Sequence, residues 1–66
     1  MKAEIITIGD EILIGQITNT NASWLAEQLV ANGIQCTRIT TVGDSFSSIK
    51  DALKKAKQEN ELVLIT

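Results

Sequence analysis

The apolar residues in the first half of the chain follow two different spacings. The segment from Ala3 to Gly9 is a short run that is apolar on both sides, which is typical of a strand covered by helices on both faces. From Thr20 or Asn21 the apolar residues recur every three or four positions, which predicts a helix that stops at Asn32 and Gly33. The apolar side of this helix contains Ala22, Leu25, Ala26, Leu29 and Val30.

The second half of the chain repeats this alternation. Residues 34–42 are rich in Thr and β-branched side chains, and their polar positions predict a half-exposed strand near a sheet edge. A short connection at Gly43 and Asp44 leads through Ser45 into a second amphipathic helix, with lysines on its polar side. Its apolar stripe contains Phe46, Ile49, Leu53 and Ala56. Residues 62–66 predict a third strand, apolar on both faces like the first.

The resulting order is strand, helix, strand, helix, strand. Strands that alternate with helices pair in parallel through right-handed crossovers. The sequence therefore predicts an α/β fold with three α/β/α layers and a parallel sheet, of which only the first β-α-β-α-β portion is present. Because residues 62–66 need neighbours to cover and pair them, we expect residues 1–66 to be the N-terminal half of a larger domain. The alternative is that a second copy completes the sheet.

Composition excludes several classes of function. The 66 residues carry a formal charge of −2, which leaves no basic face for nucleic acid. No apolar run approaches the roughly 20 residues of a membrane span. Cys36 is the single cysteine and there is no histidine, so an intramolecular disulfide and a Cys/His zinc site are excluded. We therefore expect a cytoplasmic protein with neither nucleic acid nor membrane as its partner.

The connection between the first strand and the first helix is the strongest candidate for a functional site. It runs over the ten residues from Asp10 to Asn19, whereas such loops usually have about two to six residues. Ligands of open parallel sheets bind beyond the carboxyl ends of the strands, where this loop lies. The shorter connection at Gly43 and Asp44 is predicted on the same edge.

The residue types in this loop favour a metal and a phosphate. Asp10 and Glu11 offer oxygen ligands of the kind that Mg²⁺ or Mn²⁺ prefers. The loop has no cationic side chain, so a phosphate here would need backbone N–H groups, the helix amino end or the metal. Five residues separate Gly9 from Gly15, and Gln16 stands where a Walker loop has its lysine, so that motif is excluded.

Each of these residues also has a purely structural interpretation. Asp10 and Glu11 can be solvated turn residues, Gly15 can simply permit a turn, and Asp44 can be a helix cap. On local physics alone, the segment from Asn19 to Asn21 is a helix cap and its approach. The isoleucines of the loop can cover the sheet edge or face a partner chain.

The chain resembles the competence/damage-inducible CinA family, and through it the wider molybdopterin-binding-like superfamily. The resemblance rests on one group of motifs along the whole chain: Ile8-Gly9-Asp10-Glu11-Ile12-Leu13, Gly15-Gln16-Ile17, Asn19-Thr20-Asn21-Ala22, Leu25, Leu29, Gly33-Ile34 and Thr41-Val42-Gly43-Asp44. In that family the third strand leads into a glycine-rich segment of the substrate pocket, and the chain ends just before it.

The resemblance implies a domain that hydrolyses ADP-ribose or related dinucleotide pyrophosphates with a divalent metal (Mg, Mn or Co). Many members also carry a C-terminal domain that deamidates nicotinamide mononucleotide, and we expect a homo-oligomer in the full-length protein. Carried over by position, Asp10 and Glu11 would be the catalytic and metal-binding residues. The substrate-binding residues would be Gly9, Gly15, Gln16, Asn19, Thr20, Asn21 and Asp44. The missing downstream half predicts that these 66 residues alone are inactive.

Two other functions fit the same residues. One is a domain of molybdenum cofactor assembly that binds molybdopterin or transfers an adenylyl group. The other is a non-catalytic oligomerisation module that uses the isoleucine-rich loop as its contact.

Overall fold

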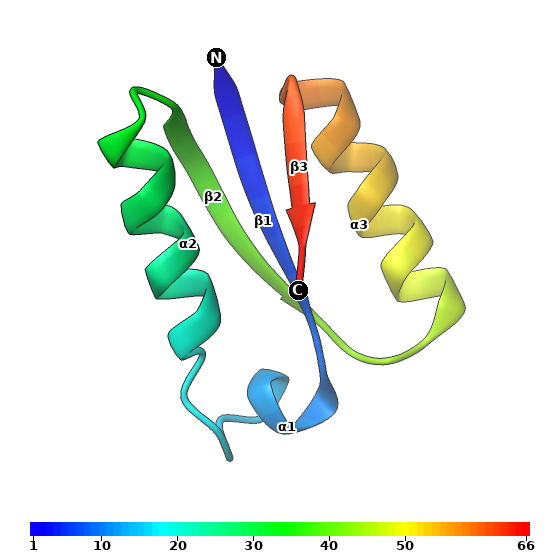
Figure 1. Cartoon of the computed structure of the whole chain (residues 1–66). Helices are drawn as coiled ribbons and strands as arrows, with labels where there is room; N and C mark the ends of the chain where they lie inside the picture. The colour runs from blue at the N-terminus through cyan, green and yellow to red at the C-terminus, as the bar shows by residue number, and fades with distance from the viewer.

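The sheet has three parallel strands, and the first strand of the chain lies at its centre (Figure 1). The computed structural model describes residues 1–66. Its strands are β1 (Lys2–Ile8), β2 (Gln35–Val42) and β3 (Leu62–Ile65), arranged in the order β2-β1-β3. The predicted α/β fold with a parallel sheet is confirmed, and β2 lies at an edge as its polar positions indicated.

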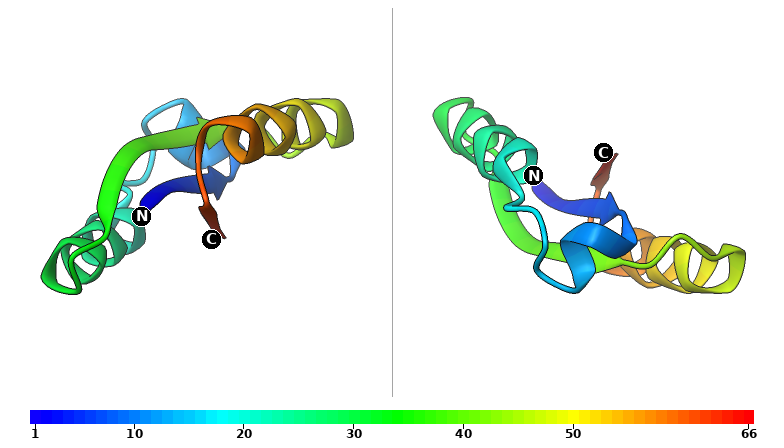
Figure 2. Two further views of the ribbon diagram at one scale, coloured as in Figure 1. Left: turned by 90° about the horizontal axis from the view of Figure 1, so that it is seen from above. Right: turned by 90° about the horizontal axis from the view of Figure 1, so that it is seen from below.

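The two long helices cover opposite faces of this sheet. The helices are α1 (Asp10–Leu13), α2 (Thr20–Ala31) and α3 (Phe46–Glu59). The connection through α2 leads from β1 to one neighbour, whereas the connection through α3 crosses over β1 to reach the other. Right-handed crossovers that run in opposite directions place their helices on opposite faces. Figure 2 shows the resulting three layers, with α2 and α3 on either side of the strands.

The core follows the alternation of side chains along β1. Ala3 and Ile5 are fully buried and pack with Ala22 and Leu29 of α2. Successive residues of a strand point to opposite faces, so Glu4 and Ile6 face α3. A central strand buried on both faces explains the apolar run that begins the sequence.

Both long helices begin at polar caps. The Asn19 side chain accepts a hydrogen bond from the Ala22 amide at 3.2 Å, and the Ser45 hydroxyl accepts one from the Ser48 amide at 3.3 Å. Such caps satisfy amides that have no partner within the helix. After α2, Gly33 adopts a φ of 75°, a left-handed conformation in which glycine avoids a Cβ clash.

Four details differ from the sequence-based expectations. Val30, assigned by its spacing to the apolar side of the first helix, is 66% exposed. The predicted loop after β1 contains the short helix α1, which no periodicity over four residues could reveal. The assignment of Phe46 to the apolar stripe of α3 is wrong, because Phe46 is 82% exposed at the first residue of that helix. Glu4, inside the predicted apolar strand, is a buried carboxylate that the pattern analysis missed.

Candidate functional site

The carboxyl ends of the three strands meet at one edge of the sheet. The Gly9 amide donates to the Val42 carbonyl at 3.0 Å, and the Ile8 amide donates to the Thr66 carbonyl at 3.1 Å. The first connection leads from β1 to β2 on one side of it, and the second leads to β3 on the other side. The direction in which strands are added to the sheet therefore reverses, and the point of reversal lies between β1 and β3. Open α/β sheets bind ligands at such a reversal. The loop that starts at Gly9 lies beside it.

Asp10 joins the two loops at this edge. Its Oδ1 atom accepts a hydrogen bond from the Asp44 amide at 3.2 Å. A Cβ atom on Gly43 would lie 2.8 Å from the same oxygen, closer than real Cβ contacts allow. The absence of a side chain at Gly43 therefore permits the approach of Asp10. Asp10 and Asp44 were predicted on the same edge of the sheet, and the structure brings them into contact.

Glu11 and the turn that follows lie on the same loop. A Cβ atom on Gly9 would be 2.9 Å from Oε1 of Glu11, so this carboxylate folds back over the end of β1. Gly15 has a φ of 81° and its Cβ position meets no atom within 4 Å, which identifies it as a turn glycine. The Gln16 amide donates to the Glu11 carbonyl at 2.8 Å, and the Gln16 side chain is exposed.

Asn19 fixes the start of α2 to the central strand. Besides capping the helix through Oδ1, it donates from Nδ2 to the hydroxyl of buried Thr7 at 2.9 Å. Thr20 and Asn21, the first residues of the helix, are exposed beside this contact. The structural role that the sequence allowed for Asn19 is thus present, and the same contact holds the helix amino end next to β1.

The acidic residues of this edge do not make a complete metal site. No three Asp, Glu, Cys or His side chains of the chain come together in a way that could hold a metal ion. Asp10 already uses one carboxylate oxygen for the Asp44 amide. Asp10 and Glu11 can therefore supply only part of a donor set.

A second polar cluster surrounds Glu4 on the α3 face. Glu4 is 2% exposed, and its carboxylate accepts hydrogen bonds from Arg38 Nη2 at 3.0 Å and from Arg38 Nε at 3.3 Å. It also accepts from the Thr40 hydroxyl at 2.7 Å and from Asn60 Nδ2 at 3.1 Å. Burial by itself would raise the pKa of Glu4, but the hydrogen bonds from Arg38, Thr40 and Asn60 and the Arg38 charge hold that pKa below its usual value.

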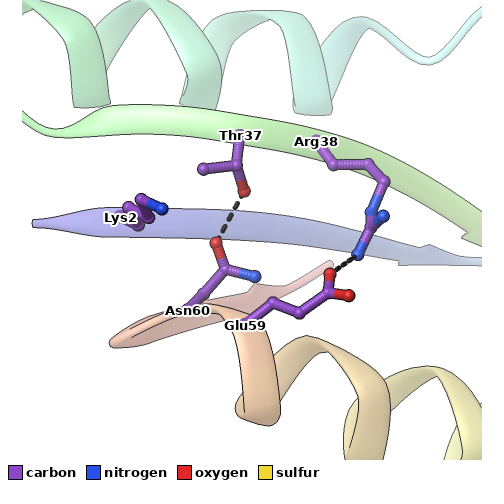
Figure 3. A pocket seen from close by; sticks show the side chains of 5 residues that line it. All are labelled: Lys2, Thr37, Arg38, Glu59 and Asn60. Atoms are coloured by element: carbon purple, nitrogen blue, oxygen red, sulfur yellow. Dashed lines mark hydrogen bonds and ion pairs between the residues drawn. The ribbon is translucent and has the colours of Figure 1, made fainter.

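An irregularity in β2 places Arg38 opposite Glu4. The pairing of β1 with β2 shifts between Ala3 and Glu4, because Ala3 pairs with Cys36 and Glu4 pairs with Arg38. The extra residue is Thr37, and bulges of this kind redirect side chains. Thr37 and Arg38 both line a cavity of about 410 Å³, shown in Figure 3 together with Lys2, Glu59 and Asn60. A lone glutamate inside an apolar strand was the sequence signal that could have revealed this cluster.

The loop after β1 also presents apolar side chains to solvent. Leu13, Ile14 and Ile17 are all exposed. Leu13, at the end of α1, lies 3.7 Å from the position that a Cβ on Gly43 would take, which places its side chain near the loop after β2.

The α/β fold and its carboxyl-edge loops define the class of protein. The family model described as a probable molybdopterin binding domain matches residues 4–66, and the chain belongs to this family. Within it, the chain is similar to CinA-like proteins. It is 52% identical over 66 residues to the CinA-like protein of Salinibacter ruber, and 40% identical over 65 residues to a putative competence-damage inducible protein of Oceanobacillus iheyensis. The matches cover 100% and 98% of this chain, which spans 16% of the length of each relative.

A solved structure agrees with this assignment. The crystal structure of CinA from Thermoplasma acidophilum, described as a protein of unknown function, superposes with a TM-score of 0.94 at 36% sequence identity. The match covers 97% of this chain and 38% of that one. The expected resemblance to the CinA family is therefore confirmed. No helix of the chain is both long enough and apolar enough to span a membrane.

Proposed function

We propose that this chain forms one wall of a nucleotide pocket in a CinA-like domain that hydrolyses ADP-ribose or a related dinucleotide pyrophosphate. The observation that carries the proposal is the hydrogen bond between Asp10 and the Asp44 amide. It joins the loops after β1 and β2 at the carboxyl edge of the sheet, and the β1 loop also borders the reversal of strand order between β1 and β3. A long loop that carries carboxylates and is held in this place is what a ligand wall of an open α/β sheet requires.

The residues of the chain would bind and orient the substrate. The Asn19 side chain takes the Ala22 amide, and the Thr20 amide donates to the Thr18 carbonyl at 3.0 Å. The Asn21 amide in the first turn of α2 is then left for a pyrophosphate oxygen, with the positive end of the helix dipole behind it. Gly9, Gly15 and Gln16 would shape the loop around the rest of the ligand.

A divalent metal belongs to this proposal only for the complete domain. Asp10 and Glu11 are the oxygen ligands that this chain would contribute, with Asp44 nearby. Bound Mg²⁺, Mn²⁺ or Co²⁺ would supply charge neutralisation for the pyrophosphate. The residues described here do not form the site by themselves, so the remaining ligands have to come from elsewhere. The 66 residues alone are accordingly expected to be inactive.

An exchange protein tests the proposal. The 66 residues of the Salinibacter ruber CinA-like protein that match this chain are replaced by this chain, and AMP release from ADP-ribose is measured with and without a chelator. We expect Glu11→Gln to reduce the rate at least tenfold. Glu27→Gln, which removes an exposed carboxylate from α2 away from the loop, is the matched control and should leave the rate unchanged. Equal rates for both variants and for the parent would overturn the proposal.

A molybdopterin-binding or adenylyl-transferring domain is the second candidate. It is favoured by the description of the matching family as a probable molybdopterin binding domain. The same exchange protein would then consume ATP in the presence of molybdopterin and leave ADP-ribose intact. Comparison of the two substrates under identical conditions separates the candidates.

Association of copies is the third element of the proposal. The exposed Leu13, Ile14 and Ile17 support a homo-oligomer that uses the loop after β1 as its contact. In the exchange protein, Ile14→Ser should lower the mass measured by light scattering. Hydrolysis that persisted in the dissociated form would argue against a non-catalytic oligomerisation module.

We further propose a cytoplasmic location and a C-terminal nicotinamide-nucleotide amidohydrolase domain, as in many members of the resembled family.

A further inference from the structure

The cavity of about 410 Å³ lies at the amino ends of the strands, on the edge opposite the loops discussed above. No hydrophobic residue lines it. Its walls come from β1, β2 and the carboxyl end of α3, as Figure 3 shows. Lys2 and Arg38 contribute two cations, and Thr37 and Asn60 contribute a hydroxyl and an amide. A polar cavity with two cations suits an anion that also carries hydroxyl groups.

The orientation of Arg38 is fixed by the buried residue Glu4. The buried carboxylate of Glu4 receives hydrogen bonds from both Nε and Nη2 of this guanidinium. Glu4 is in turn fixed by Thr40 and Asn60, and every buried polar side-chain atom of the chain has a partner. A guanidinium oriented in this way loses little side-chain entropy when it binds a ligand.

Glu59 occupies the outer side of Arg38. Its carboxylate accepts from Nη2 and is bridged to Arg38 across the mouth of the cavity (Figure 3). The Arg38 and Glu59 side chains are 41% and 49% exposed, and exposed ion pairs of this kind contribute little to stability. An anion from solvent can therefore replace Glu59 at small cost while Glu4 keeps Arg38 in position.

Lys2 is the second cation of the cavity and has no partner. Its ammonium forms no ion pair, whereas the neighbouring N-terminal amine lies 4.0 Å from Glu61. Across the cavity, the Thr37 hydroxyl lies 2.6 Å from Oδ1 of Asn60. This pair can exchange its mutual contact for the hydroxyl groups of a ligand.

We propose that this cavity binds the phosphate group of a small phosphorylated sugar or polyol, which replaces the Glu59 carboxylate on Arg38 and pairs with Lys2. Arg presents N–H donors in the planar arrangement that matches phosphate oxygens. Without a ligand, the Glu59 carboxylate occupies the position on Arg38 that the phosphate group would take. The site does not depend on the proposed nucleotide function, since it shares no residue with the loops at the other edge.

The test is a titration of the ¹⁵N-labelled chain with glucose 6-phosphate, followed through the Arg38 and Asn60 side-chain signals. Glu59→Gln should tighten binding by about three- to fivefold, because it removes the competing carboxylate. Glu27→Gln is the matched control: it removes the same charge from an exposed side chain of α2, on the other face of the sheet. We expect it to change the affinity less than twofold. Equal gains in both variants would show a general charge effect and overturn the proposal.

Five further measurements test the same proposal. Arg38→Gln should abolish saturable binding, and glucose without phosphate should not shift the signals. Inorganic phosphate should bind more weakly than glucose 6-phosphate if Thr37 and Asn60 contact the sugar. Acetate binding as tightly as phosphate would instead identify a carboxylate ligand and contradict the proposal. Calorimetry on the exchange protein with the same variants provides a second readout in case the isolated chain associates through β3, and absence of saturable binding in both forms would overturn the proposal.

Discussion

Oδ1 of Asp10 accepts a hydrogen bond from the backbone amide of Asp44, 3.2 Å away and 34 residues later in the chain. This contact links the loop after the central strand to the loop after its neighbour. It also turns the Asp10 carboxylate toward the β2 side of the edge. One of its oxygens therefore holds the loop after β2 in place without any ligand. Asp10 therefore has a positioning role that exists independently of a catalytic one.

We expect Asp10 and Gly43 to be energetically coupled. Gly43→Ala would place a Cβ 2.8 Å from Oδ1 of Asp10, so the exposed Asp10 side chain would have to rotate and give up its hydrogen bond to the Asp44 amide. The single substitution should cost about 0.5–1.5 kcal/mol of unfolding free energy, the net contribution of one hydrogen bond. In an Asp10→Ala background the same change should cost much less, because the clashing oxygen is gone. Urea denaturation of the four proteins of this double-mutant cycle measures the coupling, and additive effects would contradict a direct contact.

The hydrogen bond between Asn19 and Thr7 should contribute to the stability of the loop. Thr7→Val keeps the buried shape but removes the acceptor for Nδ2 of Asn19, and we expect it to cost about 1 kcal/mol. Thr7→Ser is the control, because it retains the hydroxyl that accepts from Asn19 and loses only the methyl group. Hydrogen exchange at the amides of Thr20 and Asn21 should accelerate in Thr7→Val beyond the change seen in Thr7→Ser. An unchanged ratio between the two variants would show that the contact does not hold the start of α2.

The chain should lose stability in mild acid through Glu4. The pKa of Glu4 lies below its usual value in the folded chain, so its contribution is complete above the usual glutamate pKa and is lost as pH falls through the lowered one. We expect the free energy of unfolding to decline from about pH 5 downward. Thermal unfolding recorded between neutral pH and pH 3 measures this decline.

Glu4→Gln is the variant that isolates this effect. At pH 7 it should cost about 1–3 kcal/mol, because its amide group faces the donors of Arg38 and Asn60. Its stability should depend less on pH than that of the parent. If the two curves ran parallel down to pH 3, the acid sensitivity would belong to other carboxylates.

Gly15 should be replaceable at a predictable cost. Its φ of 81° disfavours a side chain, while its Cβ position is open space. We expect Gly15→Ala to cost about 1–2 kcal/mol and Gly15→Asn to cost less, because asparagine tolerates the left-handed region. A loss of nucleotide affinity in the exchange protein that is larger for Gly15→Asn than for Gly15→Ala would point to a ligand contact instead of a turn. Calorimetric titration and thermal unfolding distinguish the two roles.

The sequence predicted the layers of the fold because burial imposes periodicity. The spacing of Ala22, Leu29 and Ala56 reflects helices that pack against a sheet, and all three are buried. Phe46 did not follow the same logic. It is the first residue of α3 and is 82% exposed, so an apolar residue at the right spacing is not always a core residue.

The candidate site was predictable in location and only partly in detail. Loop length and strand polarity indicated the edge of the sheet on which Asp10 and Asp44 would both lie. They could not indicate that an oxygen of Asp10 would bond a backbone amide, because that depends on the space left by Gly43. The cluster around Glu4 depends on the bulge at Thr37, and a one-residue change of register leaves no periodic signal in the sequence.

The position of β1 has a consequence for how the protein is made. β1 leaves the ribosome before both of its hydrogen-bonding partners, β2 and β3. Until residue 62 has emerged, one edge of an isoleucine-rich segment stays open to pairing with other nascent chains. A charge within such a segment discourages that pairing. The carboxylate of Glu4 is such a charge while the chain is unfolded, and in the folded protein it binds Arg38.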